Sequence, residues 1–214
     1  MKKLLITMFA SVATLGSNAQ DINTLFRQMP DQYIPQLENA WRKDITDLYN
    51  EGKDASLKNN MNGTSVLELM NEDYLRLKST ESTRIEMRRL PLINNTYVIC
   101  MVTTYFGPVA DSKVEFFSTD WKPLNTGDII NLAKREDFFK TDNDTTSIAW
   151  QEVNSFADFD LIEYRLDENE PMLTAIYNTP EYLPKEMLDK INAFIKSKEK
   201  KYTWKNSRFE CSDK

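Results

Sequence analysis

The chain has 214 residues, 41% of them hydrophobic, and carries 27 basic and 33 acidic residues for a net charge of −6. So many apolar side chains can fill a core, which excludes a disordered chain. An acidic chain repels phosphate backbones and anionic lipid headgroups, so we expect neither nucleic acid nor a membrane surface as a partner.

Residues 1–19 have the three parts of a secretory signal peptide: two lysines, an apolar run over residues 4–15, and small residues before Gln20. The apolar run is too short to cross a hydrocarbon core of about 30 Å, and no cysteine follows it to carry a lipid anchor. We therefore expect export to the periplasm or the extracellular space, without membrane insertion after cleavage. Loss of the two lysines would change the net charge from −6 to −8.

Residues 20–63 are predicted to be helical. Apolar positions three and four residues apart over 22–29 predict a first helix, which Asp21 can cap and Pro30 ends. A second helix is expected over residues 35–52, with a proline in its first turn and a glycine at its end.

Residues 64–135 are predicted to form a first hairpin unit, because the apolar pattern changes to a period of two. Short strands are expected around residues 67–69, 74–77, 85–87, 96–105 and 114–117. Residues 96–105 are apolar on both faces, which predicts a central strand. Thr126 is expected to cap a following helix.

Residues 148–214 are predicted to form a second hairpin unit after a polar loop at 140–147. Strands are expected over residues 161–166, 172–177, 202–204 and 208–209, with a helix over 184–195. Residues 20–214 are thus expected to be a single α+β domain, in which an antiparallel sheet built from hairpins carries the N-terminal helices and one or two further helices.

A faint internal repeat relates residues 84–90 to residues 161–166, each followed by a strand and later by a tryptophan. If the two hairpin units lie side by side, Trp121 and Trp204 should be close together. Apolar neighbours favour a core position for Trp121. For Trp204 a core position and an exposed binding platform both remain open.

The chain resembles an exported domain-of-unknown-function family from Bacteroidales-type bacteria. The segments that carry the resemblance include Met29-Pro30, Leu90-Pro91-Leu92, Phe116-Phe117, Trp121, Thr179-Pro180 and Trp204-Lys205-Asn206. These are mostly core and turn residues, so the resemblance implies a fold and no assigned activity. Ser207 departs from the glycine that a tight hairpin prefers after asparagine.

The chain contains no histidine, which excludes Ser-His-Asp and Cys-His nucleophiles and nearly all zinc, copper and non-haem iron sites. It has only five glycines, none spaced to cradle a phosphate, and no CxxC pair. No metal and no cofactor is therefore expected.

Carboxylate chemistry is what remains, and acids cluster near the start of one predicted strand beside aromatic residues. The candidate binding residues are Asp158, Asp160, Glu163, Tyr164 and, separately, Trp204. Such an arrangement could stack a sugar or supply two carboxyl groups for its hydrolysis. The alternative is that these acids are simply solvated.

The loop at residues 142–146 offers oxygen ligands, but it lacks the glycine and the final glutamate of a calcium loop, so an acidic loop is the preferred interpretation. Asp144-Thr145-Thr146 resembles the O-glycosylation signal of exported proteins in the same bacterial group, which makes Thr145 a candidate attachment site.

Cys100 and Cys211 could pair in an oxidising compartment. The alternative is that Cys100 is a small buried hydrophobe and Cys211 a free thiol.

Two functions remain open. The first, which we favour, is a non-catalytic binding or interaction module that recognises a protein or glycan of the cell envelope. The second is a carboxylate-dependent hydrolase that acts on glycans or peptides.

Overall fold

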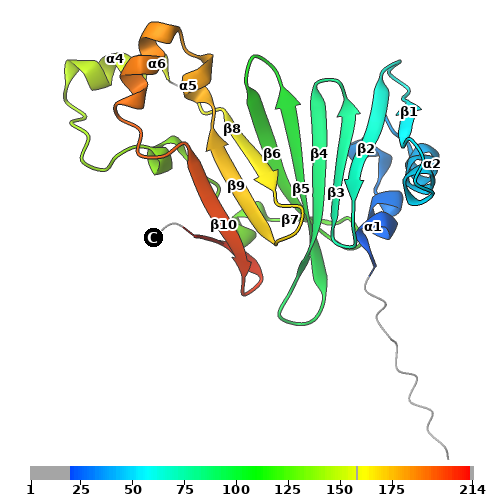
Figure 1. Cartoon of the computed structure of the whole chain (residues 1–214). Coiled ribbons are helices and arrows are strands. Elements are labelled where there is room, and N and C mark those ends of the chain that lie inside the picture. The colour runs from blue at the N-terminus through cyan, green and yellow to red at the C-terminus, as the bar shows by residue number, and fades with distance from the viewer. Residues whose placement is uncertain (1–19, 158, 213–214) are drawn as a thin grey trace, which may run out of the picture.

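The computed structural model describes residues 20–157 and 159–212, and these residues form two antiparallel β-sheets (Figure 1). The large sheet consists, in spatial order, of β1 (Ser56–Lys58), β2 (Thr64–Met70), β3 (Tyr74–Thr80), β4 (Thr83–Pro91), β5 (Tyr97–Phe106), β6 (Ala110–Ser118) and β7 (Pro123–Leu124). The small sheet consists of β8 (Ile162–Leu166), β9 (Met172–Tyr177), β10 (Glu199–Lys205) and β11 (Arg208–Cys211). The predicted antiparallel α+β fold is confirmed.

Short helices accompany the sheets. They are α1 (Ile22–Gln28), η1 (Asp31–Tyr33), α2 (Asn39–Asn50), α3 (Thr126–Ile129), η2 (Arg135–Phe138), α4 (Ile148–Phe156), α5 (Thr179–Tyr182) and α6 (Lys185–Asn192). As predicted, Asp21 caps α1, where its side chain accepts a hydrogen bond from the Thr24 N–H at 2.8 Å.

Several helices differ from the prediction, among them α6, which ends at Asn192 and not at residue 195. The second helix begins at Asn39 and not at residue 35, because a turn closed by the Leu37 N–H and the Ile34 carbonyl precedes it (3.0 Å). The helix after residue 125 is a single turn, and Asn125 caps it instead of Thr126. Helix α4 was not predicted, although Ser147 caps it.

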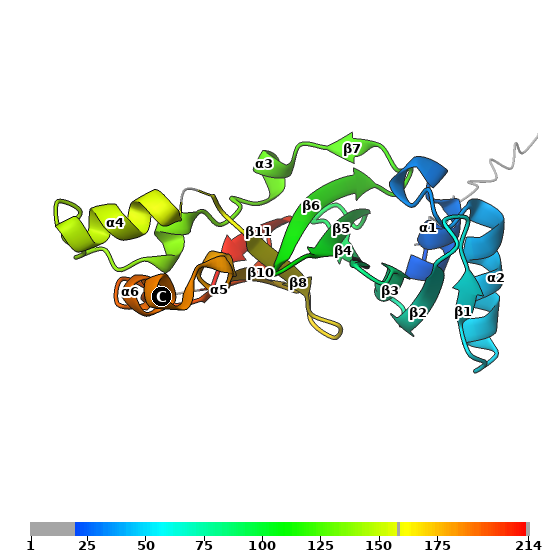
Figure 2. The same cartoon turned by 90° about the horizontal axis from the view of Figure 1, so that it is seen from above.

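β5 is central, as predicted, and separates two hydrophobic cores. Its residues Val98, Cys100 and Val102 pack toward the small sheet, whereas Ile99 and Met101 pack toward α1 and the residues near α2. Alternate side chains of one strand point to opposite faces, so a run that is apolar throughout serves both cores. Figures 1 and 2 show the small sheet with α4–α6 at one end of the molecule and α1 and α2 at the other.

The small sheet is fastened to the large one through its edge strand β8. The backbone N–H of Ile162 donates to Asp111 Oδ1 and that of Tyr164 donates to Ser112 Oγ, both at 3.0 Å. An edge strand has unpaired N–H groups, and buried ones need partners. Side chains of β6 supply these partners, so β8 ends its sheet without a further strand.

The expectation that Trp121 and Trp204 lie close together is wrong. Trp121 belongs to the core under α1, where it packs 5.2 Å from Phe117, and Trp204 belongs to the core between the two sheets. The indole of Trp204 is buried and donates to the Pro91 carbonyl at 2.7 Å, which excludes an exposed platform. The two hairpin units form separate sheets and not one sheet of side-by-side repeats.

The β10–β11 turn shows how the chain accommodates serine where glycine is preferred. Asn206 and Ser207 both have positive φ, 49° and 65°. The Ser207 hydroxyl accepts a hydrogen bond from the Ile93 N–H at 2.9 Å, a contact that glycine could not make.

The two cysteines are free in this structure. Cys100 is buried in β5 and Cys211 is exposed at the end of β11. The structure thus has Cys100 as a small buried hydrophobe and Cys211 as a free thiol, without a disulfide between them. Burial raises the pKa of the Cys100 thiol, so that it stays protonated.

Candidate functional site

Among the described residues, the site residues expected from the sequence do not gather in one place. Side chains alternate along β8, so Glu163 and Tyr164 point to opposite faces of the small sheet. The Tyr164 hydroxyl lies in the core and accepts a hydrogen bond from the Ala133 N–H at 2.9 Å. Asp160 is exposed, and Asp158 lies outside the described residues.

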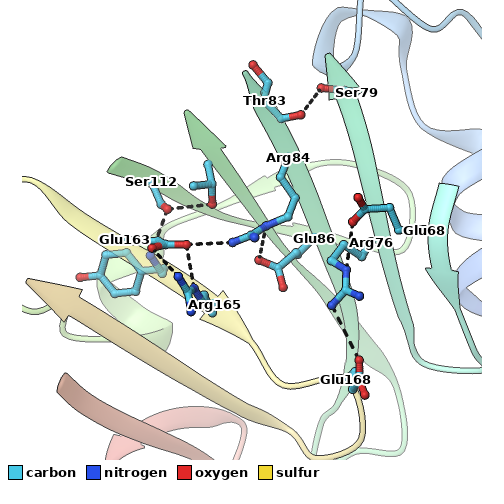
Figure 3. A network of polar contacts seen from close by, with 12 residues as sticks. Glu68, Arg76, Ser79, Thr83, Arg84, Glu86, Ser112, Glu163, Arg165 and Glu168 are labelled. Carbon is cyan, nitrogen blue, oxygen red and sulfur yellow. Dashed lines mark hydrogen bonds and ion pairs between the residues drawn. The ribbon is translucent and has the colours of Figure 1, made fainter. Parts of the chain in front are cut away.

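Glu163 belongs to a charged cluster at the junction of the sheets, formed by Arg84, Glu86, Glu163 and Arg165 (Figure 3) together with Tyr74. We call it the inter-sheet cluster. Arg84 Nη2 lies 2.9 Å from Glu163 Oε1 and Arg84 Nε lies 3.3 Å from Glu86 Oε2, so one guanidinium bridges both carboxylates. Arg165 donates to both oxygens of Glu163, at 2.7 and 2.9 Å. The Tyr74 hydroxyl donates to Glu86 Oε1 at 2.7 Å.

Two further arginines hold the β8–β9 turn against the large sheet. Arg88 donates to the carbonyls of Asp167 and Asn169, at 2.8 and 2.9 Å. Arg76 lies 3.7 Å from Glu168 on the same turn. The junction of the sheets is thus fastened by guanidinium groups of β3 and β4, which suit carbonyl and carboxylate acceptors.

The two glutamates of the cluster are buried, with 4% of the Glu86 side chain and 3% of the Glu163 side chain exposed. Burial would raise the pKa of Glu163, but the hydrogen bonds and charges of Arg165 and Arg84 hold this pKa below its ordinary value. Burial raises the pKa of Glu86 and prevails over the hydrogen bond from Tyr74 and the charge of Arg84. Of these two glutamates, Glu163 is therefore the one that keeps its negative charge to the lower pH.

We expect Glu163→Gln to lower the free energy of unfolding at pH 7 by about 1–2 kcal/mol, because it weakens charge-assisted bonds while half-exposed Arg165 can be rehydrated. A carboxylate with a lowered pKa in the folded state stabilises the fold above its unfolded pKa, and this contribution disappears as the pH falls through the folded value. The difference from wild type should therefore be complete at pH 7 and shrink below the ordinary glutamate value of 4.5. Urea unfolding at several pH values measures it.

Glu168→Gln is the matched control, since Glu168 is half exposed and pairs with Arg76 only at 3.7 Å. It should change the stability by less than about 0.5 kcal/mol. Equal effects of the two substitutions, or a loss in Glu163→Gln that does not depend on pH, would contradict a structural role for the Glu163 charge.

A second feature lies on the opposite face of the large sheet, between η1 and the strands β5 and β6. A cleft of about 350 Å³ opens there, which we call the tyrosine cleft. It is lined by Gln32, Tyr33, Met101, Thr103, Tyr105, Lys113 and Glu115. The cleft combines the exposed phenol ring of Tyr105 and the partly buried one of Tyr33 with polar side chains, which is the lining of a small-molecule site.

No group of three or more acidic or cysteine side chains in residues 20–157 and 159–212 is arranged to hold a metal ion. The charges of the inter-sheet cluster are directed at one another, and its carboxylates pair with two guanidinium groups and not with a metal ion.

Sequence reasoning singled out Glu163 but missed its partners Arg84 and Glu86. A signal for them exists in β4, where Arg84, Glu86 and Arg88 alternate with the apolar Ile85 and Met87. Charged residues that alternate with apolar ones in a mostly buried strand indicate ion pairs, because unpaired charges are not found there. The tyrosine cleft was missed as well, since Tyr33 and Tyr105 are far apart in the sequence.

Two antiparallel sheets joined by buried ion pairs, with a polar cleft on the outer face, define an α+β protein for which the fold itself implies no reaction. The chain belongs to a family of proteins of unknown function (DUF3256), whose model matches residues 14–209.

Among solved structures, the chain is similar to a domain of an uncharacterized protein from Porphyromonas gingivalis W83. The two are 29% identical with a TM-score of 0.80, over 88% of this chain and 97% of that one. No curated protein matches the chain. The resemblance to a domain-of-unknown-function family, with a relative in the Bacteroidales, is thereby confirmed.

Proposed function

We propose that this protein is an exported, non-catalytic binding protein of the cell envelope, located in the periplasm or at the outer surface. The observation that carries the proposal is the internal pairing of Glu163. Both of its oxygens accept hydrogen bonds from Arg165, and one also contacts Arg84. The most deeply buried carboxylates thus fasten the two sheets together, and the exposed groups suited to a ligand lie elsewhere, in the tyrosine cleft.

The alternative, a carboxylate-dependent hydrolase, needs two carboxyl groups about 5–10 Å apart on either side of a sugar ring. Glu86 and Glu163 lie close together and have pKa values shifted in opposite directions. However, one guanidinium bridges them and almost none of their surface is exposed. A substrate would have to displace Arg84 to reach them.

Co-sedimentation with envelope material from the producing bacterium tests the proposal. We expect the purified mature protein to be retained on this material without releasing reducing sugars or amino groups. Release of either product that is lost in Glu163→Gln would favour the hydrolase instead. Absence of both retention and release would remove the binding function.

We expect the protein isolated from its host to begin at Gln20, because residues 1–19 carry the features of a cleavable signal. Those residues lie outside the described part of the structure. Within the described part, no helix is long and apolar enough to cross a membrane. Intact mass spectrometry of the envelope fraction measures the N-terminus, and protein that retains Met1 there would contradict export by this route.

We further expect a glycan on Thr145. The residue is exposed in the loop before α4, where Asp144 Oδ1 accepts hydrogen bonds from the N–H and hydroxyl of Thr146 and leaves Thr145 accessible. An added sugar would remain in solvent and leave the core unchanged. The native mass should exceed the sequence mass by a glycan that Thr145→Ala removes. A native mass without this increment would contradict the assignment.

A further inference from the structure

The tyrosine cleft forms where β5 runs from the core into solvent. Along the face of β5 that carries Ile99, the exposed fraction of alternate residues rises toward the end of the strand: 2% for Met101, 9% for Thr103 and 53% for Tyr105. Tyr33 of η1 packs on Phe117 at the buried end of this face. At the exposed end, the phenol ring of Tyr105 and polar side chains of β5 and β6 line the cleft, in a volume of about 350 Å³.

The second ring of the cleft, Tyr33, is held in place by the core beneath it. Its centroid lies 4.7 Å from that of Phe117, edge to face, and 5.7 Å from that of Trp121. A ring fixed by such packing loses little conformational freedom when a ligand binds. The wall of the cleft is therefore preformed.

The charges of the cleft neutralise each other. Lys113 Nζ lies 2.8 Å from Glu115 Oε1 on neighbouring positions of the same β6 face, and the lysine side chain is largely exposed. The hydrogen bond to Glu115 raises the pKa of Lys113, so this ion pair persists at neutral pH. The pair offers donors and an acceptor side by side, but no net charge to attract an ion.

These features match the chemistry of a sugar. A pyranose ring has an apolar C–H face that can lie on a phenol ring, and vicinal hydroxyl groups that can donate to a carboxylate and accept from an ammonium group. We propose that the tyrosine cleft binds a neutral oligosaccharide, with a sugar ring on Tyr105 and hydroxyl groups on Lys113 and Glu115. This inference rests on the proposed binding function and names its site and ligand class.

The neighbouring residue provides a matched control on the other side of the same strand. Phe106 is 40% exposed, and the Arg84 guanidinium lies 5.1 Å from the centroid of its ring, on the face of the inter-sheet cluster. An acidic ligand would prefer that face, because arginines gather there. Tyr105 and Phe106 are consecutive residues whose side chains lie on opposite faces of the large sheet, so a substitution of each tests one face.

The experiment uses the mature protein on a glycan array with neutral oligosaccharides (cellohexaose, mannohexaose and chitohexaose) and acidic ones (oligogalacturonate and heparin fragments). Calorimetry on the neutral glycan bound best then compares variants. We expect Tyr105→Ala to weaken binding by about ten-fold or more, the effect of losing one aromatic contact. Tyr105→Phe should bind within about three-fold of wild type. Lys113→Met should weaken binding as well, and Phe106→Ala should bind like wild type.

Two kinds of result would overturn the inference. Binding of acidic glycans alone, or a loss in Phe106→Ala with Tyr105→Ala unchanged, would move the site to the inter-sheet face and leave the envelope-binding function intact. Retention on envelope material without binding to any neutral glycan would reject the ligand class. Failure of the proposed function is distinct, since the wild-type protein would then not be retained on envelope material at all. Unfolding curves of each variant confirm that the folded protein is compared.

Discussion

Trp121→Ala is expected to lower the free energy of unfolding by about 3–5 kcal/mol, the usual loss for a large aromatic side chain in a core. Trp121 is 5% exposed, and the centroid of its ring lies 5.2 Å from that of Phe117 and 5.7 Å from that of Tyr33. Its Nε1–H donates to the buried carbonyl of Leu25 at 3.0 Å, so truncation would leave this acceptor without a partner.

The backbone of Trp121 strengthens this expectation. Its φ is +60°, a conformation that bulky residues rarely adopt and that costs energy unless packing maintains it. Urea unfolding measures the loss, and Ile148→Ala, at a residue 84% exposed, is the control that should stay within about 0.5 kcal/mol of wild type. A Trp121→Ala protein as stable as this control would show that the side chain does not support the core.

Most strands of the large sheet could be predicted because their patterns are local. The alternation of β3, in which Leu75 and Leu77 are buried and Arg76 and Lys78 are partly exposed, and the apolar run of β5 each indicate burial without knowledge of distant partners. Antiparallel pairing follows from the short turns between strands. The cap of α1 by Asp21 was predictable for the same reason, since cap and helix are adjacent in the chain.

The placement of the two tryptophans was not predictable from local pattern. Phe116 and Phe117 are consecutive and point to opposite cores, so a tryptophan a few residues later could belong to either. The left-handed turn at Trp121 decides the matter by returning the indole to the face of Phe117. Trp204, by contrast, lies in β10 of the small sheet, and its side chain belongs to the core between the two sheets.

The two site features depend on contacts between distant segments. Arg84 and Glu163 are 79 positions apart, and their ion pair exists only because β8 docks on β6. The tyrosine cleft likewise needs η1 beside β5, which no sequence period indicates. Composition could exclude histidine chemistry, but it could not say which of 33 acids would be buried.

Arg42→Leu is expected to lower the free energy of unfolding by about 3–5 kcal/mol, the range for a broken buried charge network. The guanidinium is fully buried and donates to the carbonyls of Phe26 (3.1 Å), Leu37 (2.7 Å) and Met29, and it lies 2.9 Å from Asp31 Oδ1. These acceptors lie in α1 and in the segment between α1 and α2. One side chain therefore satisfies the backbone of a segment that has little secondary structure of its own. Leucine would remove this donor from all three carbonyls, although that of Phe26 would still accept from the Met29 N–H at 3.3 Å.

Arg42→Lys separates geometry from charge. Lysine retains the positive charge but has no planar fork to reach three carbonyls, so we expect an intermediate loss and not a rescue. Lys43→Ala, next in the same helix and exposed, is the control and should lie within about 0.5 kcal/mol of wild type. Urea unfolding gives the stabilities, and hydrogen exchange should show faster exchange of the N–H groups of residues 29–38 in Arg42→Leu. If Arg42→Lys were as stable as wild type, the charge near Asp31 would matter and the carbonyl contacts would not, because only the charge is common to both side chains.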